Sequence, residues 1–293
     1  MPAELRTYSE RDSPFFRLRS KNKLASLLFS SPAKLRELSN GTDYYHEFQK
    51  EKKDGSLRDL AAPRDDLKRV QRRIADLLKR IAPPDYLFSP VPGRSYVDNA
   101  ARHLGARAIR LLDIEDFFPS CTANKVIWFF HKRLECAPDV SAMLRGIVTR
   151  NDALPQGSPC SPILAYLCYV DMWDEIEDLV ANNGCRLSVY ADDLTISGDV
   201  VPERVIWEIK KTLRKHGHRY KLEKERSIID RSAEITGVIL SPEGLRLPNR
   251  QHQKAHKLRK TYKEEKSPEL REKLKQRILG HQAQARQISS RDD

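Results

Sequence analysis

The sequence lacks a long apolar run, and no uninterrupted apolar segment approaches the roughly 18 residues that indicate a membrane-spanning helix. We therefore expect no membrane span. Cysteine is scarce, with 5 residues in a chain of 293, and no two of them form a C-x-x-C pair. This spacing argues against a zinc knuckle. Because no secretory leader is recognisable either, the cysteines favour a reducing, cytoplasmic location.

Acidic residues are too few to balance the basic ones. Lys and Arg number 53 against 41 Asp and Glu, so the formal net charge is +12 and the sequence pI is about 9.5. A basic excess favours a polyanionic partner, with nucleic acid ahead of an anionic membrane. A soluble basic protein without such a partner is the alternative. Internal repeats and low-complexity linkers are also absent, and the length suffices for one large domain or a few subdomains.

Hydrophobic spacing predicts both helices and strands. The expected elements are, in chain order, a basic helical lead-in over 1–40, an amphipathic helix over 67–81, a buried strand over 106–118, a helix from about Thr122, a long helix over 161–180, a two-stranded hairpin over 186–198 and a helix over 202–217. The basic face of the helix at 67–81 is either simply solvated or follows a phosphate backbone. Strand, helix, hairpin, helix and a last strand form the β-α-β-β-α-β order of a ferredoxin-like sheet.

The C-terminal part adds two features. The stretch "EITGVILSPEGLRLP" predicts two short strands around a turn that contains Pro242 and Gly244. The tail from residue 251 is rich in Lys, Arg and Gln, and we expect two helices that are broken near Ser267 and Pro268.

Two aspartates stand side by side in "VYADDL", between apolar residues. Adjacent carboxylates repel each other, and burying them costs free energy. A tight turn would project Asp192 and Asp193 from the sheet, and Asp113 ends a strand that is a neighbour in a ferredoxin-like order. Such a cluster suits two Mg²⁺ ions about 3.5–4 Å apart, the arrangement that supports phosphoryl transfer. Taken alone, ordinary turn aspartates explain the motif better.

Two loops carry further candidates. "LPQGSPCSPILA" places Gln156 and Gly157 before the long helix, where glycine allows close backbone approach and glutamine offers a donor and an acceptor. "QKEKKDGSLRDLAAP" places Lys52, Lys53 and Arg58 around a glycine turn, which could grip a triphosphate. An ordinary loop and a solvated basic hairpin are the alternatives.

Together these stretches resemble the motifs of one family. "DIEDFF" at 113–118, "LPQGSPCSP" at 154–162 and "YADD" at 190–193 resemble motifs A, B and C of reverse transcriptases, in the family's order, and "KKDGSLRDLAAP" resembles the fingers motif. The similarity covers roughly residues 44–250. It implies an α+β right-hand polymerase with helical and β fingers, a ferredoxin-like βαββαβ palm and a short helical thumb.

The resemblance also implies how the chain is divided. The expected segments are 1–105 for the N-terminal helices and fingers, 106–121 for the first palm strand, 122–160 for helices and a loop of fingers and palm, 161–238 for the remaining palm, and 239–293 for the primer-grip hairpin and thumb.

The same resemblance implies roles for single residues. Asp113, Asp192 and Asp193 would be catalytic, and with the carbonyl of Ile114 they would hold two Mg²⁺ ions. The implied nucleotide-binding residues are Lys52, Lys53, Arg58, Phe118, Gln156 and Gly157. Of these, the cations would lie near the dNTP triphosphate, Gln156 and Gly157 would flank the sugar and base, and Phe118 would lie under the sugar 2′ position.

Two short motifs indicate a branch of the family. "NAARH" at 99–103 resembles the N-A-x-x-H signature of bacterial retron reverse transcriptases, and "ITG" at 235–237 resembles their V-T-G signature with Ile for Val. This implies RNA-binding roles for Asn99, His103, Thr236 and Gly237. It also implies reverse transcription of a cognate structured noncoding RNA, primed from a 2′-OH, into a branched RNA–DNA hybrid (msDNA), and antiphage defence with a separate effector protein.

One departure and two alternatives accompany this interpretation. Where the family commonly has N-x-x-K, "LEKERS" at 222–227 places Glu223 and Arg226, so either Lys224 or Arg226 could be the general acid toward pyrophosphate. Another bacterial reverse transcriptase, associated with a group II intron, CRISPR or abortive infection, is one alternative. The other is a catalytically silent, RNA-binding polymerase-like protein.

Overall fold

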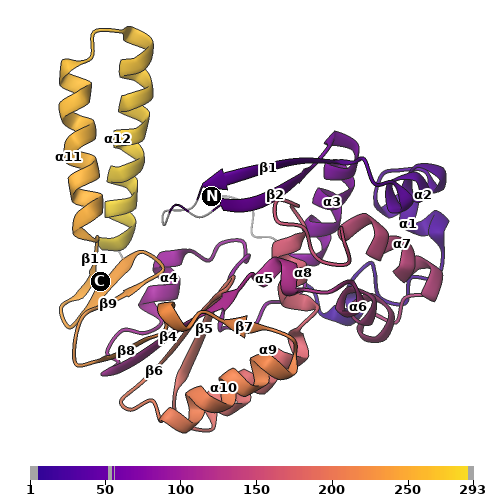
Figure 1. Cartoon of the computed structure of the whole chain (residues 1–293), viewed down its shortest axis with the longest axis horizontal. Helices are drawn as coiled ribbons and strands as arrows, with labels where there is room; N and C mark the ends of the chain where they lie inside the picture. The colour runs from indigo at the N-terminus through magenta and orange to yellow at the C-terminus, as the bar shows by residue number, and fades with distance from the viewer. Residues whose placement is uncertain (1–5, 52–54, 56, 290–293) are drawn as a thin grey trace. The chain divides into compact units, whose positions relative to one another are not determined.

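The computed structural model describes residues 6–51, 55 and 57–289. The chain divides into two compact units, which are described separately. The first comprises Met1–Pro92, Ile114–Glu177 and Glu208–Tyr220, and the second comprises Gly93–Asp113, Asp178–Trp207 and Lys221–Asp293. Figure 1 labels their helices and strands.

The chain contains both helices and strands, grouped in runs such as the helices α5–α9 and the strands β8–β11, which confirms the expected α+β class. The principal helices are α1 (Lys21–Leu27), α2 (Pro32–Asn40), α3 (Asp65–Leu78), α4 (Tyr96–Ala101), α5 (Phe117–Ser120), α6 (Ala123–Ile127), α7 (Pro138–Val148), α8 (Ser161–Leu167), α9 (Val170–Ala181), α10 (Glu203–Lys215), α11 (Asn249–Glu264) and α12 (Pro268–Ser289). The strands are β1 (Tyr45–Glu51), β2 (Leu57–Pro63), β3 (Leu87–Ser89), β4 (Ala108–Glu115), β5 (Arg186–Tyr190), β6 (Asp193–Gly198), β7 (Arg219–Tyr220), β8 (Arg226–Ile229), β9 (Ala233–Ile235), β10 (Val238–Ser241) and β11 (Gly244–Arg246).

The amphipathic helix expected over 67–81 is present as α3. Its apolar positions are buried, among them Leu67, Val70 and Ile74, as the helical spacing predicts. Part of its basic face contacts protein, since the Arg73 guanidinium lies 4.5 Å from the Phe29 ring centroid. Other basic side chains of this face, such as Lys68 and Arg72, are exposed.

The prediction of one continuous helix over 161–180 is wrong, because the structure divides this segment into α8 and α9. The two intervening residues are Cys168 and Tyr169. Tyr169 N donates to Tyr166 O over 3.0 Å, three residues back, so the regular four-residue hydrogen-bond pattern is interrupted there. The interruption turns the Tyr169 hydroxyl to the backbone of Ser120 and Thr122.

The central sheet of the second unit is antiparallel. Its strands lie in the order β5–β6–β4–β8, with β4 between β6 and β8. Numbered by chain order these are strands 2, 3, 1 and 4, which is the arrangement of the predicted β-α-β-β-α-β sheet. Residues of both faces are buried in β5 and β6, so the sheet is covered on both sides.

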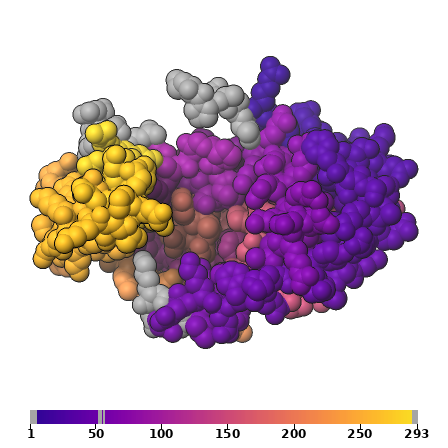
Figure 2. Space-filling view, turned by 90° about the horizontal axis from the view of Figure 1, so that it is seen from above, coloured from indigo at the N-terminus to yellow at the C-terminus, as the bar shows by residue number. Residues whose placement is uncertain are grey.

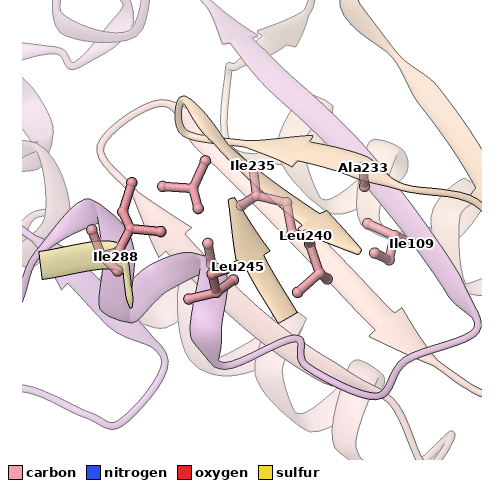
Figure 3. Packing of buried hydrophobic residues seen from close by; sticks show 9 residues of the cluster. Ile109, Ala233, Ile235, Leu240, Leu245 and Ile288 are labelled. Carbon is pink, nitrogen blue, oxygen red and sulfur yellow. The ribbon is translucent and has the colours of Figure 1, made fainter. Parts of the chain in front are cut away.

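A small sheet of β9, β10 and β11 has its own apolar core in the second unit. Figure 3 shows Ile235, Leu240 and Leu245 of this sheet packing with Ile109 of β4 and Ile288 of α12. The turn between β10 and β11 pairs Ser241 with Gly244, as the Pro242–Gly244 spacing predicts. Burial of these side chains anchors the end of α12 to the sheet.

The basic tail forms the two expected helices, α11 and α12, which pack against each other and break before Pro268. Figure 2 shows their surface in yellow. Most of their Lys and Arg side chains are exposed, among them Lys254, Lys260 and Arg277. Across residues 6–51, 55 and 57–289, no helix is both long enough and apolar enough to span a bilayer.

Candidate active site

The two adjacent aspartates lie at the tight turn between β5 and β6. Tyr190 pairs with Asp193, so Ala191 and Asp192 form a two-residue loop. Ala191 has φ 57°, a left-handed conformation that costs a non-glycine residue about 1–2 kcal/mol. The strands on both sides are buried, and their packing offsets this cost. The turn therefore contains Asp192, as predicted, whereas Asp193, which was also expected to project from the turn, is the first residue of β6 and pairs with Tyr190.

Asp113 of β4 lies directly opposite Asp193 of β6 in the antiparallel register. Opposite residues of such a pair place their Cβ atoms about 4.5–5.5 Å apart, and like charges there are destabilising. Asp113 is only 6% exposed. The fold thus brings together carboxylates from two motifs that are far apart in the sequence.

Two lysines compensate the Asp113 carboxylate. Lys221 Nζ lies 2.7 Å from Asp113 Oδ1, and Lys224 Nζ lies 2.6 Å from Oδ2. Arg226 instead donates to the backbone carbonyls of Glu223 and Glu225, over 2.7 Å in each case. Of the two residues considered as a general acid, Lys224 is therefore the one that contacts the Asp113 carboxylate.

Sequence reasoning missed Lys221. It precedes the 3₁₀ turn Leu222–Lys224, and residues three apart in a 3₁₀ turn lie on the same side. The Lys221 backbone N–H also donates to Asp113 O over 2.9 Å. The spacing of Lys221 and Lys224, three residues apart, was the sequence signal for a shared partner. That partner can be identified as Asp113 only once this turn is known to lie beside β4.

The electrostatics of the cluster suit a divalent cation. Burial, followed by repulsion from Asp192 and Asp113, raises the pKa of Asp193 to about 7. Burial and Asp113 also raise the pKa of Asp192. Carboxylate oxygens are hard donors that Mg²⁺ prefers, so the donor chemistry fits this ion. Within the part of the chain that the structure describes, however, no three His, Cys, Asp or Glu side chains converge as a complete metal-ligand group.

A polar cavity of about 400 Å³ adjoins the carboxylates in the second unit. Its lining includes Asp113, Asp193, Lys224, Glu234 and Thr236. The cavity therefore connects the carboxylates with the strand β9 and the turn that follows it.

The first unit has a groove of about 610 Å³ between the β1–β2 hairpin and the loop that precedes α8. Gln156 lines it, and Gln156 O accepts a hydrogen bond from Ala61 N over 2.8 Å. Gly157 has φ 125°, and a Cβ atom there would lie 2.8 Å from Ala61 O. Glycine is thus required where the loop approaches the hairpin.

A buried glutamine anchors this loop. Gln71 of α3 is 0% exposed, and its Nε2 donates to Tyr45 OH over 2.9 Å and to Ile147 O over 2.8 Å. Ser158 Oγ donates to Gln71 Oε1 over 2.6 Å. One side chain therefore links the hairpin, α7 and the Gln156–Gly157 loop, and no sequence pattern had singled it out.

The remaining nucleotide-binding candidates lie in the first unit or outside the described residues. Arg58 is exposed on β2, opposite Lys50 of β1. Lys52 and Lys53 fall outside the described residues. Phe118 is half-buried on α5, with its ring centroid 5.7 Å from that of Phe117.

Ile114, whose carbonyl is the expected backbone ligand of a metal ion, is fully buried and pairs with Tyr220 of β7.

Of the four residues expected to contact RNA, Asn99 and His103 are interior, and Thr236 and Gly237 are partly exposed. His103 is 0% exposed, and its ring nitrogens lie 2.6 Å from Ser197 Oγ and 2.7 Å from Ser188 Oγ. Asn99 is 1% exposed and donates to Thr236 Oγ1 over 3.3 Å. The structure thus differs from the expected direct contact with RNA, because these polar groups bond to other parts of the second unit. Gly237 forms a turn with Thr236.

A family model described as reverse transcriptase (RNA-dependent DNA polymerase) matches residues 50–240. The retron Se72 reverse transcriptase of Salmonella heidelberg is 34% identical over 53% of this chain and 41% of the relative. The retron Ec86 reverse transcriptase of Escherichia coli is 35% identical over 48% and 44%. The retron Mx65 reverse transcriptase of Myxococcus xanthus is 31% identical over 68% and 51%. The chain thus spans about half, or less, of the length of these relatives.

Solved structures give a weaker likeness. A foamy viral protease-reverse transcriptase in complex with an RNA/DNA hybrid has a TM-score of 0.46 and 18% identity, covering 81% of this chain and 27% of the viral chain. A related foamy viral structure in complex with double-stranded DNA has a TM-score of 0.47 and 18% identity, covering 81% and 35%.

Proposed function

Because the chain belongs to the reverse transcriptase family, we propose that it is an RNA-directed DNA polymerase of the retron type. The observation that carries the proposal is the pairing of Asp113 with Asp193 beside the turn of Asp192. A cross-strand pair of like charges is costly for the fold alone. A reaction that needs carboxylate oxygens as ligands for divalent metal ions would explain why the fold keeps these aspartates together.

The carboxylates of Asp113, Asp192 and Asp193, with the carbonyl of Ile114, would hold two Mg²⁺ ions. When bound, such ions activate the attacking hydroxyl oxygen and stabilise the oxygen that leaves with pyrophosphate. The chain's own part is to hold three carboxyl groups together where the end of β4 meets the β5–β6 turn, and to supply positive charge beside them. Lys224, which contacts Asp113, is our choice for the proton donor to pyrophosphate, and Lys221 would hold the Asp113 carboxylate in its orientation.

The nucleotide would use residues of the fingers and palm motifs. Gln156 and Gly157 would flank the sugar and base, on the loop that Gln71 anchors. Phe118 would exclude a ribose 2′-OH by steric repulsion. Arg58, together with Lys52 and Lys53, would bind the triphosphate as charge-assisted donors.

The template and product would bind to basic surfaces. The exposed lysines and arginines of α11 and α12 would follow the duplex phosphates, and the exposed part of the basic face of α3 would add to this. The strands β10 and β11 would grip the primer end. The division into fingers, palm and thumb, with the boundaries expected from the sequence, is part of the same proposal.

The biology of retrons completes the proposal. Its support is that the relatives compared above are retron reverse transcriptases. The enzyme would copy a cognate noncoding RNA into msDNA and act in antiphage defence with a separate effector. Thr236 and Gly237 would contribute to RNA recognition as the β9–β10 turn, which buried Asn99 holds, and buried His103 would act only indirectly, by bridging β5 and β6.

Two assays test this function. Purified protein with Mg²⁺, dNTPs and a primed RNA template should extend the primer, and Asp113→Asn should not. A protein that binds RNA but never incorporates dNTPs would be the catalytically silent alternative.

Expression with the native flanking locus addresses the retron type. One small RNA joined to a DNA of defined length should copurify, and RNase should leave a short RNA remnant on that DNA. Primer extension with only heterogeneous nucleic acid bound would instead indicate another bacterial reverse transcriptase.

A further inference from the structure

A single helical turn carries Phe118. α5 consists of Phe117–Ser120 only, and its N-cap residue Asp116 has φ 42° and makes no side-chain capping hydrogen bond. Forming one isolated helical turn is unfavourable, because several dihedral angles are fixed for one hydrogen bond. The position of α5 must therefore come from contacts with other elements of the first unit.

His218 is fixed beside α5 by the end of α10. Gly217 has φ 87°, and His218 N donates to Leu213 O over 2.9 Å, the long hydrogen bond of a Schellman motif. The next residue, Arg219, begins β7 and pairs with Glu115 at the end of β4. The His218 backbone is thus held by a helix terminus on one side and a strand pair on the other.

The His218 side chain reaches α5 through Ser120. His218 Nδ1 lies 2.8 Å from Ser120 Oγ, and Ser120 Oγ donates to Phe117 O over 2.9 Å. Because the one hydroxyl hydrogen of Ser120 is used on Phe117 O, His218 must donate its Nδ1 hydrogen to Ser120 Oγ. Burial lowers the pKa of His218 to about 4, so the ring is neutral near pH 7.

Aromatic packing and Tyr169 support the same turn. The Phe117 ring centroid lies 5.7 Å from that of His218, and the Tyr169 and His218 centroids lie 4.4 Å apart. Tyr169 OH donates to Ser120 O over 3.1 Å and accepts a hydrogen bond from Thr122 N over 3.2 Å. The interruption between α8 and α9, which the sequence did not reveal, is what brings this hydroxyl to α5.

We propose that His218, acting through Ser120, is a positioning residue that holds α5 and thereby sets how strongly Phe118 discriminates against ribonucleotides. The inference rests on the proposed function, in which Phe118 faces the sugar. Steric exclusion depends steeply on where a ring is held, whereas dNTP insertion makes no clash that a small shift would relieve. A loosened α5 should therefore lower sugar discrimination more than it lowers DNA synthesis.

The test measures kcat/KM for dNTP and rNTP insertion on a primed RNA template. His218→Leu, which removes the donor, should raise the rNTP/dNTP ratio by about fivefold, the factor that one hydrogen bond represents. Ser120→Ala should raise the ratio similarly. His218→Asn keeps an N–H group one bond from Cγ, as in Nδ1 of histidine, and should return the ratio toward the wild-type value.

Ser141→Ala is the matched control, because Ser141 Oγ also donates to a helix carbonyl, Ala137 O, over 3.0 Å. It should leave the ratio unchanged. If His218→Leu fails to fold, the rNTP/dNTP ratio of Ser120→Ala tests the inference instead, because that change removes only a hydroxyl group. Unchanged ratios in Ser120→Ala and in folded His218→Leu, while Phe118→Ala raises the ratio, would overturn the inference but not the proposed function. If the wild-type chain inserts no dNTP at all, the proposed function fails and the inference fails with it.

Discussion

The Asn99 side chain donates a hydrogen bond to the Thr236 hydroxyl over 3.3 Å, joining two short motifs that are 137 residues apart. Thr236 Oγ1 also donates to Tyr96 O over 3.0 Å. Thr236 has φ 47° and Gly237 has φ 87°, so both residues of the β9–β10 turn are left-handed. This conformation is rare for a β-branched residue, and the two contacts to α4 hold it. The two signatures of the retron branch therefore form one structural unit.

We expect Asp192→Asn to abolish most DNA synthesis. The change keeps the shape of the turn but removes a charge from the site, and one well-placed electrostatic group is worth about 3–4 kcal/mol of barrier, or roughly 10²–10³ in rate. RNA affinity should be retained, because phosphate contacts elsewhere supply it. Single-turnover dNTP incorporation and an RNA-binding titration measure both. Asp199→Asn, an exposed aspartate just beyond β6, is the control. Wild-type incorporation by the Asp192 variant would refute the assignment.

Phe118→Ala should raise rNTP incorporation relative to dNTP incorporation. The half-buried phenyl ring is the proposed barrier to a 2′-OH, and its removal relieves that repulsion. The ratio of the two kcat/KM values is the measurement, with exposed Phe29→Ala as the control. An unchanged ratio in an active variant would remove Phe118 from sugar selection and leave it as a packing residue.

Lys224→Met should tighten Mg²⁺ binding. Lys224 Nζ lies 2.6 Å from Asp113 Oδ2, so its ammonium group competes with a cation for the same oxygen. A Mg²⁺ titration of the thermal unfolding midpoint should give a lower apparent Kd for the variant. Lys215→Met, which removes an exposed lysine paired with Glu175, is the matched control. Weaker Mg²⁺ binding would show that the lysine assists the metals. DNA synthesis should still fall if Lys224 is the proton donor.

His103→Leu should destabilise the fold and impair synthesis equally on native RNA and on an annealed primer–template. Two buried serine hydroxyls lose their partner, which costs about 2–4 kcal/mol of unfolding free energy. Urea unfolding at pH 7 measures this, and exposed His252→Leu is the control. A selective loss on native RNA would instead support direct recognition.

The same residue predicts a pH dependence. Burial lowers the pKa of His103 to about 3, below its ordinary value of 6.5, so the unfolded chain takes up the proton first as the pH falls. The stability contributed by neutral His103 is complete above pH 6.5 and is lost between pH 6.5 and 3, by about 1.4 kcal/mol per pH unit. Urea unfolding at pH 7, 6 and 5 should show a flatter profile for His103→Leu than for the wild type. Parallel profiles would contradict this prediction.

Gly157→Ala should displace the loop that carries Gln156 and raise the KM for dNTP. The new Cβ would meet Ala61 O at 2.8 Å, and φ 125° is unfavourable for alanine. Gly105→Ala is the matched control, since φ 75° also disfavours alanine but no heavy atom lies within 4 Å of the added Cβ. Steady-state kinetics and thermal unfolding separate the two effects. Equal behaviour of both variants would mean that backbone strain, and not the contact with Ala61, governs position 157.

Local patterns in the sequence were sufficient for the α+β class, the amphipathic helix α3, the hairpin around Asp192 and the break before Pro268, because hydrophobic period, turn residues and proline act over a few residues. They were also sufficient for the resemblance to retron reverse transcriptases, which the family match and the relatives confirm.

Long-range pairing was decided only in the tertiary structure. The spacing of Lys221 and Lys224 does not by itself name a partner, and Lys221 meets Asp113 because the turn after β7 lies against β4. The sequence shows Gln71 only as a polar residue in a helix. Its three hydrogen-bond partners, Tyr45, Ile147 and Ser158, come from separate segments that meet only in the folded chain. Burial likewise turned His103 from an expected RNA contact into an interior bridge between two strands. Burial and hydrogen-bond partners depend on residues about a hundred positions away, and no local pattern encodes that distance.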